Sequence, residues 1–388
     1  MTLSTGGRVG LAGAAVVGVA FGMARYAYGL TLPGIRQDLE LSELVLGLIA
    51  GATFAGYLAG LLLAGPLAAR RGSRAPTTLG GTCGAAGAVI VTVAQSPLPL
   101  AVGAVLAGSA GGWVWASYSD IVTRTVPPRQ QPRTLAVITT GTSGGLVLLG
   151  GLAVLAAVGS WRLVWGGIAL AAVAAAVVNL GLVPRAGPAP HPDGQRGASS
   201  LTRTLKVPAA YSVVYFAVIV IYFTYAADVL TRDLPAAAVP ALYAAIGVTG
   251  TVGVATGAVA RRVGSLRVAA LCLVTVAAAL ALLGLAGDSL AATAASACVF
   301  GVGYMTGSAV LAVWTAELVP ERAGAAFTGC LIVGAVSSVA APVLAGAVIP
   351  GLGLEALLVL TAAVSLLSGV ALWLHGASAG GTATETGP

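Results

Sequence analysis

Arg25 and Asp228 are the two charged residues whose positions suggest chemistry inside an otherwise apolar chain. Arg25 lies within an apolar stretch at about 9–32, and Asp228 lies near one end of another at about 207–231. A charged side chain in hydrocarbon costs from about 2.5 kcal/mol to more than about 10 kcal/mol, so it is expected to face a cavity or a partner. Arg25 could therefore bind an anionic or polar solute, or pair with an acid, and Asp228 could carry a proton.

Each of these residues also has a structural interpretation. Arg25 could donate to neighbouring backbone carbonyls, and Asp228 could lie at a helix end in headgroup water. Their similar depth, in helices expected to be neighbours, favours a hypothesis in which the two form an ion pair. His191 and His375 fall in a loop and at the end of a span, so a coupled proton would have to be carried by a carboxylate.

Aromatic and polar residues recur at helical spacing in four apolar stretches. Residues three, four or seven positions apart share one face of a helix. The stripes are Arg25 with Tyr28; Ser109, Trp113, Ser117 and Asp120; Tyr211, Tyr215, Tyr222 and Tyr225; and Tyr304, Ser308, Leu311 and Thr315. Trp115 is expected to point away from its stripe. Such stripes suit a cavity for an amphipathic organic solute, whereas hydrogen bonds between helices and interfacial anchoring of tyrosine are the alternatives.

The composition shows which kind of scaffold must position these residues. Of 388 residues, 58% are hydrophobic and only 8% are charged, whereas soluble domains carry about a quarter charged residues. The apolar residues form blocks of about 20, long enough to cross hydrocarbon, and the 55 glycines suit close helix packing. The net charge of +7 is spread over short clusters, which argues against nucleic-acid binding. The four cysteines have no metal-ligand spacing, so no metal site and no structural disulfide are expected.

Twelve apolar stretches are predicted to span a membrane as helices, and a hydrophilic segment divides them into two sets of six. They run at roughly 9–32, 44–67, 76–95, 98–120, 134–158, 161–183, 207–231, 238–260, 267–287, 290–316, 323–349 and 352–374. The segment 184–206 is rich in Pro, Gly and Ser, which indicates a linker. We therefore expect a first half at 1–183, a linker at 184–206, a second half at 207–374 and a disordered tail at 375–388.

The basic residues fall mainly on one side of these spans. With the N-terminus inside, the inner segments hold fifteen of the nineteen: Arg8, Arg70, Arg71, Arg74, Arg124, Arg129, Arg133, Arg185, Arg196, Arg203, Lys206, Arg261, Arg262, Arg267 and Arg322. The outer segments hold Arg36, Arg162 and Arg232. Because Lys and Arg concentrate in cytoplasmic loops, both termini, the linker and the tail are expected in the cytoplasm.

An internal repeat relates the two halves. The sequence GPLAARRGSR at 65–74 aligns without a gap with GAVARRVGSL at 257–266, an offset of 192 residues. Each copy follows the second span of its half. Two six-helix halves in the same orientation, joined by a cytoplasmic linker, form a parallel repeat.

The loop at 65–74 resembles the signature of the major facilitator family, Gly-x-Leu-Ala-Asp-Arg-x-Gly-Arg-(Arg/Lys), although Ser73 stands at one of its Arg positions. The matching residues are Gly65, Leu67, Ala68, Arg70, Gly72 and Arg74 in the first copy, and Gly257, Ala260, Arg262 and Gly264 in the second. Ala69 and Arg261 stand where the family has Asp, which argues against the family's usual cytoplasmic latch. The first span, FGMARYAYGLTLP, is similar to that of a largely uncharacterised bacterial branch. The resemblance implies an all-α integral membrane protein with the major facilitator fold, two six-helix halves related by pseudo-twofold symmetry.

In that family the first, fourth, seventh and tenth helices line a central cavity, so the resemblance places the polar stripes around a substrate. The predicted substrate-binding residues are Arg25, Tyr28, Ser109, Trp113, Tyr222, Tyr225, Tyr304 and Ser308, with Asp228 as the proton-coupling residue. The predicted cytoplasmic gate consists of Arg70, Arg74, Asp120, Arg262 and Glu317. These residues lie close to other charges in the sequence, which favours salt bridges at the gate.

The sequence therefore predicts a secondary active transporter of a small organic solute. It is expected to export the solute in exchange for protons by alternating access. The protein is expected to be a monomer in the bacterial plasma membrane. Uptake or exchange of a small organic anion, with Arg25 as its counter-charge, is the alternative. The expected partners are a small-molecule substrate, protons and the lipid bilayer, with no cofactor. Without a Walker loop the energy must come from a gradient. An enzyme would need clustered His, Asp or Cys within the spans, and a sensor usually carries a soluble domain, so neither is expected.

Overall fold

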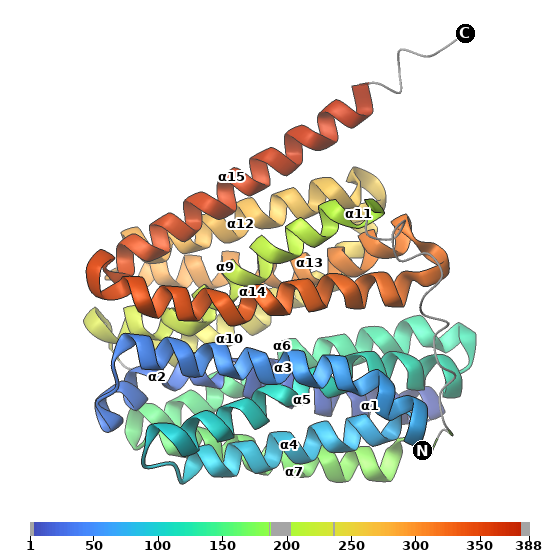
Figure 1. The fold of residues 1–388 in the computed structure, drawn as a ribbon, viewed down its shortest axis with the longest axis horizontal. Coiled ribbons are helices and arrows are strands. Elements are labelled where there is room, and N and C mark those ends of the chain that lie inside the picture. Colours follow the sequence, from blue (N-terminus) through green and yellow to red (C-terminus); the bar gives the residue numbers. More distant parts are fainter. Residues whose placement is uncertain (1–3, 186, 188–202, 236, 382–388) are drawn as a thin grey trace.

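The computed structural model describes residues 4–185, 187, 203–235 and 237–381. Within these ranges the chain is almost entirely helical and contains no strand. The helices lie side by side in an elongated bundle, with the turns gathered at its two ends (Figure 1). Helices satisfy their own backbone hydrogen bonds, which apolar surroundings require. The prediction of an all-α membrane protein is confirmed.

The first half of the bundle contains six helical segments. They are α1 (Thr5–Val17) continued by η1 (Gly18–Ala24) and α2 (Arg25–Leu39), α3 (Glu43–Arg71), α4 (Arg74–Thr92), α5 (Pro97–Thr125), α6 (Gln131–Val158) preceded by η2 (Pro128–Gln130), and α7 (Trp161–Leu182). η1 is π-helical, and single π turns inside helices often mark functional sites. Arg25 is the first residue after it.

The second half repeats this plan. Its segments are α9 (Lys206–Asp233), α10 (Ala238–Gly250) continued by η3 (Thr251–Ala255) and α11 (Thr256–Val263), α12 (Ser265–Leu285), α13 (Leu290–Leu318), α14 (Ala323–Leu352) preceded by η4 (Pro320–Arg322), and α15 (Leu354–Gly381). Eleven of the segments among the described residues are long and apolar enough to cross a membrane. The other, α4, is rich in Gly and Thr and packs between α5 and α7.

The two halves meet in a symmetric way. α2 packs against α9, α3 against α14, and α6 against α10 (Figure 1). In order along the chain these are the first segment with the seventh, the second with the eleventh, and the fifth with the eighth. If the two halves are exchanged, the contact of α3 with α14 becomes the contact of α10 with α6, and the contact of α2 with α9 is unchanged. This pattern is the pseudo-twofold relation that the sequence repeat predicts.

Several boundaries differ from the expected ones. The first span continues to Leu39, so Arg36 lies on a helix rather than in an outer loop. A helix can extend past the hydrocarbon layer where water solvates its polar residues, and hydropathy alone stops too early there. α15 likewise runs to Gly381, beyond the expected end at 374. Most of the predicted linker, and the rest of the predicted tail at 382–388, lie outside the described residues.

Glycine permits close contact between the halves. A Cβ on Gly29 in α2 would overlap the carbonyl oxygen of Phe223 in α9. Gly47 in α3 similarly faces the carbonyl oxygen of Pro342 in α14. Membrane helices gain their association energy from such close packing of small residues.

Replacing Gly29 by alanine should destabilise the folded protein by about 3 kcal/mol, the upper end of the usual cost of overpacking, because backbone atoms cannot yield to the added methyl group. The control is Gly144→Ala in α6, where a Cβ would meet nothing within 4 Å. Thermal unfolding of both purified variants, followed by tryptophan fluorescence, measures the difference. Equal melting temperatures would show that the crossing at Gly29 does not limit stability.

Candidate functional site

A cavity of about 220 Å³ lies between the two halves, near the middle of the bundle. Its walls are largely aromatic, with Phe21, Tyr26, Tyr57 and Trp115 from the first half and Phe216, Tyr304 and Phe327 from the second. Arg25 is its charged wall residue, and Thr139, Thr142 and Ser308 add hydroxyl groups. This lining suits a solute with an apolar or aromatic body and one polar, negatively charged end.

Arg25 is surrounded by rings instead of acids. Its guanidinium carbon lies 4.2 Å from the ring centre of Tyr57, and 5.1–5.8 Å from those of Phe21, Tyr26 and Phe54. The side chain is 5% exposed, and its buried Nε has no hydrogen-bond partner. None of the ion pairs of the described chain includes it. Cation–π contacts, about 2 kcal/mol when desolvated, hold the charge but leave it without a counter-anion.

Two other predicted binding residues share this cavity with Arg25. Tyr304 lines it from α13 and accepts a 2.9 Å hydrogen bond from the hydroxyl of Tyr26. Ser308, one turn further along α13, has its hydroxyl 3.0 Å from that of Tyr215. The Tyr26–Tyr304 bond crosses between the halves and connects the neighbour of Arg25 to the opposite wall.

On α5 a different face from the predicted one lines this cavity. Trp115 lines the cavity, whereas Trp113 lies outside it and has a buried indole nitrogen without a partner. Ser109 donates to the carbonyl of Leu106 in its own helix, at 2.7 Å. A period of 3.6 residues divides a helix into faces but does not say which face meets the cavity.

Tyr28 and two of the α9 tyrosines also lie away from the main cavity. The Tyr28 hydroxyl donates to the carbonyl of Leu46 in α3, at 3.0 Å. The Tyr222 ring stacks on Phe300 at 3.6 Å, and its hydroxyl lies 2.9 Å from that of Ser296. Tyr225 donates to the carbonyl of Pro342 at 3.4 Å.

The other two tyrosines of the α9 stripe are buried in the bundle, not anchored at the membrane surface. Tyr211 donates to the carbonyl of Gly307, and Tyr215 donates to that of Tyr304. All four tyrosines therefore fasten α9 to its neighbours, as a buried hydroxyl must find a partner.

An aromatic layer closes one side of the cavity. Tyr26 from the first half stacks on Phe223 from the second, with ring centres 3.6 Å apart and planes 17° apart. Phe223 also meets Tyr304 edge to face at 5.2 Å. Sequence reasoning did not single out Tyr26 or Phe223, because neither breaks the apolar pattern of its stretch.

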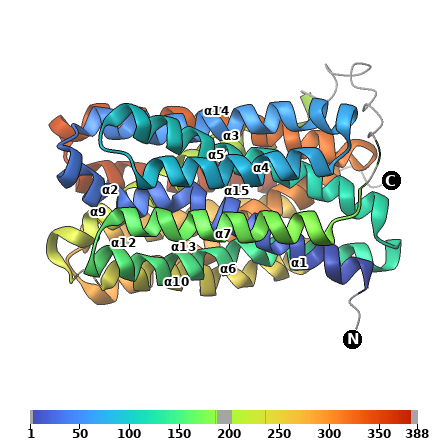
Figure 2. The same cartoon turned by 90° about the horizontal axis from the view of Figure 1, so that it is seen from below.

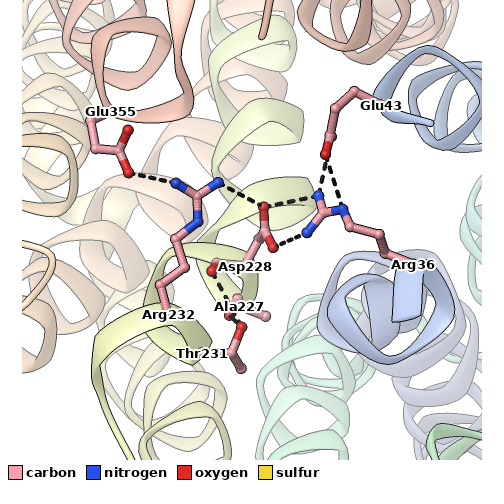
Figure 3. Close-up of polar contacts among 7 residues, drawn as sticks. All are labelled: Arg36, Glu43, Ala227, Asp228, Thr231, Arg232 and Glu355. Atoms are coloured by element: carbon pink, nitrogen blue, oxygen red, sulfur yellow. Dashed lines mark hydrogen bonds and ion pairs between the residues drawn. The ribbon is translucent and has the colours of Figure 1, made fainter. Parts of the chain in front are cut away.

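Beyond this aromatic layer, at the end of the bundle where α2 and α9 end, Asp228 belongs to a chain of ion pairs (Figure 3). Both Asp228 oxygens bind the guanidinium of Arg36, one of them at 3.0 Å, and Arg232 lies 3.6 Å away on the other side. Arg36 also binds Glu43 at 3.0 Å, and Arg232 binds Glu355 at 2.7 Å. Among the described ion pairs, Arg36–Asp228 is the one that joins the halves.

The hypothesis that Arg25 pairs with Asp228 is therefore wrong. Arg36 takes that place because α2 continues to Leu39 and carries Arg36 to the depth of Asp228. At about 1.5 Å per residue, the eleven positions from Arg25 to Arg36 span about 16 Å, too far for both to reach the same acid.

At the opposite end the predicted gate residues do not meet across the halves. Asp120 accepts from Ser73, and from Arg124 at 3.4 Å, and both donors belong to the first half. Arg74 donates to the carbonyl of Leu180, also in the first half. Arg70, Arg262 and Glu317 are exposed.

This is the end at which α1 begins and α15 ends (Figure 1). Phe327, one turn from the start of α14 there, lines the cavity. The ion pair Arg36–Asp228 thus joins the halves at the end opposite this one.

Together these features define a polytopic α-helical membrane protein with a central cavity between two pseudosymmetric halves. The model of the Major Facilitator Superfamily matches residues 14–330, and the chain belongs to that family of transporters. No curated protein matches the sequence.

Solved structures with the same fold are transporters. A peptide transporter, POT, in complex with sulfate has a TM-score of 0.77 and 14% identity, over 96% of this chain and 94% of that one. A mutant of the nucleoside transporter NupG has a TM-score of 0.71 and 12% identity, over 94% and 99%. The human organic anion transporter MFSD10 has a TM-score of 0.68 and 18% identity, over 95% and 100%. At such identities the likeness shows the fold alone.

Replacing Asp228 by asparagine should open the charged end of the bundle, because Arg36 then keeps Glu43 but loses the carboxylate of the other half. Breaking one side of a buried ion pair costs about 3–5 kcal/mol, and about 1.4 kcal/mol is tenfold in an equilibrium constant. We expect at least about tenfold faster maleimide labelling of Leu46→Cys, a buried position in α3, with the native cysteines replaced by serine.

The matched control is Asp38→Asn. Asp38 pairs with Arg162 inside the first half, so the change in charge is the same but no contact between the halves is lost. Equal labelling of the two variants would show that Asp228 does not hold this end closed.

Proposed function

We propose that the chain is a secondary active transporter that carries a small organic anion between two states of alternating access. The observation that carries this proposal is Arg25: a buried cation on the cavity wall, with aromatic rings around it and no carboxylate bound to it among the described residues. A substrate anion supplies the missing charge. The same residue favours an anion over the neutral or cationic solutes that a purely aromatic cavity would accept.

The energetics support this assignment. Moving a charge out of water costs several kcal/mol, and an anion held by charge-assisted hydrogen bonds offsets that cost better than rings do. A guanidinium presents paired N–H donors that match the two oxygens of a carboxylate. The rings that now surround Arg25 would then pack against the apolar body of the bound solute.

The asymmetry of the two ends supports alternating access. Arg36–Asp228 and the Tyr26–Phe223 stack separate the cavity from one end, and the other end has no described ion pair across the halves. With the basic loops in the cytoplasm, this is an inward-facing state with a closed outer gate. Binding an anion at Arg25 would favour rocking of the halves by stabilising a state in which both halves contact the solute.

Proton coupling, if it uses Asp228, would act on the outer gate instead of in the cavity. Adding a proton to Asp228 removes the charge that holds Arg36, and Glu43 keeps Arg36 on its own half. Outward transport remains our proposed direction and rests on the bacterial proteins that the first span resembles. Uptake or exchange of the anion is the alternative. The proposed setting is the plasma membrane, with both termini inside and the protein acting as a monomer.

Arg25→Gln should reduce transport at least about tenfold, because the neutral amide gives up the charge-assisted contact, worth about 1.5–3 kcal/mol. Mass spectrometry of small molecules inside and outside expressing cells measures this against wild type. An anion depleted inside by wild type alone identifies an exporter, and one that accumulates identifies an importer. Arg133→Gln, an exposed arginine outside the cavity, is the control. Transport of only neutral or cationic compounds, unchanged in Arg25→Gln, would refute the proposal.

Asp228→Asn tests proton coupling separately. We expect a protonophore to abolish accumulation against a gradient in wild-type proteoliposomes. The variant should still exchange substrate down its own gradient but should no longer use the proton gradient, because it lacks the carboxylate that joins the two halves at the gate. Gradient-driven accumulation that survives in Asp228→Asn would show that another group carries the proton.

A further inference from the structure

A second cavity, of about 590 Å³, lies far from the central one, on the outer side of the first half. It is formed by the end of α3, the start of α4 and the end of α7. Helices α4 and α7 lie side by side on the side of the first half that faces away from the second half (Figures 1 and 2). A cavity on this face opens towards lipid rather than towards the transport pathway.

Three arginines surround this cavity: Arg71, Arg74 and Arg185. Arg74 donates to the carbonyl of Leu180 and so connects α4 to the C-terminal end of α7. Arg71 and Arg185 are exposed, and neither takes part in an ion pair of the described chain. The cavity thus concentrates three positive charges with no acidic residue among its lining residues.

The start of α4 lies at the same cavity. Ser73, the residue before α4, makes no side-chain capping bond, although the backbone N–H of Ala75 donates to the carbonyl of Gly72 and the Ser73 hydroxyl binds Asp120. Helix N-termini attract anions because their backbone N–H groups and the helix dipole point the same way. Arg74 and Ala75, in the first turn, line the cavity.

Apolar side chains lie beside the arginines. Leu79 and Leu180 line the cavity and are 37% and 48% exposed. They are placed further towards the bundle middle than Arg71, on the surface that meets acyl chains. The pattern of cationic groups at the membrane edge with leucines below them matches a phosphate headgroup attached to lipid tails.

We propose that this cavity is a binding site for an anionic phospholipid of the cytoplasmic leaflet, with its phosphate between Arg71 and Arg185 and its acyl chains along Leu79 and Leu180. Basic pockets between membrane helices on the cytoplasmic side are suited to such headgroups, and each Lys or Arg near an anionic surface adds about 1 kcal/mol. The site lies at the loop joining α3 and α4, so a bound lipid would stabilise the end of the bundle opposite the Arg36–Asp228 ion pair.

The test uses purified, delipidated full-length protein and adds dioleoyl phosphatidylglycerol or dioleoyl phosphatidylcholine. Native mass spectrometry counts bound lipid, and thermal unfolding gives the stabilisation. We expect phosphatidylglycerol to bind at least about tenfold more tightly than phosphatidylcholine in wild type, the ratio for about 1.4 kcal/mol. The double variant Arg71→Gln, Arg185→Gln should lose this preference. Arg74 is kept because it holds α7.

The control is Arg129→Gln, Arg261→Gln, which removes two exposed arginines from the same end of the bundle but outside the cavity. This variant should bind phosphatidylglycerol as wild type does. Equal losses in the two double variants would mean that only the general charge of this end attracts lipid, and would overturn the site. Stabilisation by glycerol 3-phosphate equal to that by the lipid would also overturn it, in favour of a soluble phosphate.

Discussion

The charge on Asp228 has to be neutralised because its side chain is only 3% exposed, and the arginine that neutralises it belongs to the other half of the molecule. A carboxylate taken out of water is stable only with opposite charge and hydrogen bonds around it. The two halves must therefore come together at this end for Arg36 to neutralise Asp228. The crossing at Gly29 and the stack of Tyr26 on Phe223 lie next to it, where the halves come closest. A transporter needs such a contact to be strong when closed and replaceable when open, and Glu43 and Arg232 provide the replacement partners.

Arg25 and Arg36 lie on one continuous helix, but different groups stabilise their charges. Arg36 has acids from two helices, whereas Arg25 has four rings. The rings place no negative charge beside Arg25, whereas two carboxylates neutralise Arg36. In the proposed function, Arg36 serves the gate and Arg25 binds the solute, with the aromatic layer of Tyr26 and Phe223 between them.

Much of the fold could be predicted because its main determinants are local. Each span is an apolar stretch of sufficient length, and hydropathy does not depend on which neighbours the stretch acquires. The repeat of GPLAARRGSR in GAVARRVGSL predicted two equivalent halves, and the helix contacts agree. The errors are at the helix ends. The predicted first span ended too early because polar residues such as Gln37 follow Pro33. Water at the membrane edge allows the helix to continue to Leu39.

The candidate site could be predicted only in part. The sequence by itself determined that Arg25 must face the interior, since a charge facing lipid is too costly, and that α13 presents Tyr304 with Ser308. It did not determine which face of α5 meets the cavity, where Trp115 and not Trp113 lies, nor which arginine reaches Asp228. Those outcomes depend on the rotation of each helix and on the register between halves more than a hundred residues apart. Only tertiary packing decides them, because helical periodicity is the same whichever way the helix is turned.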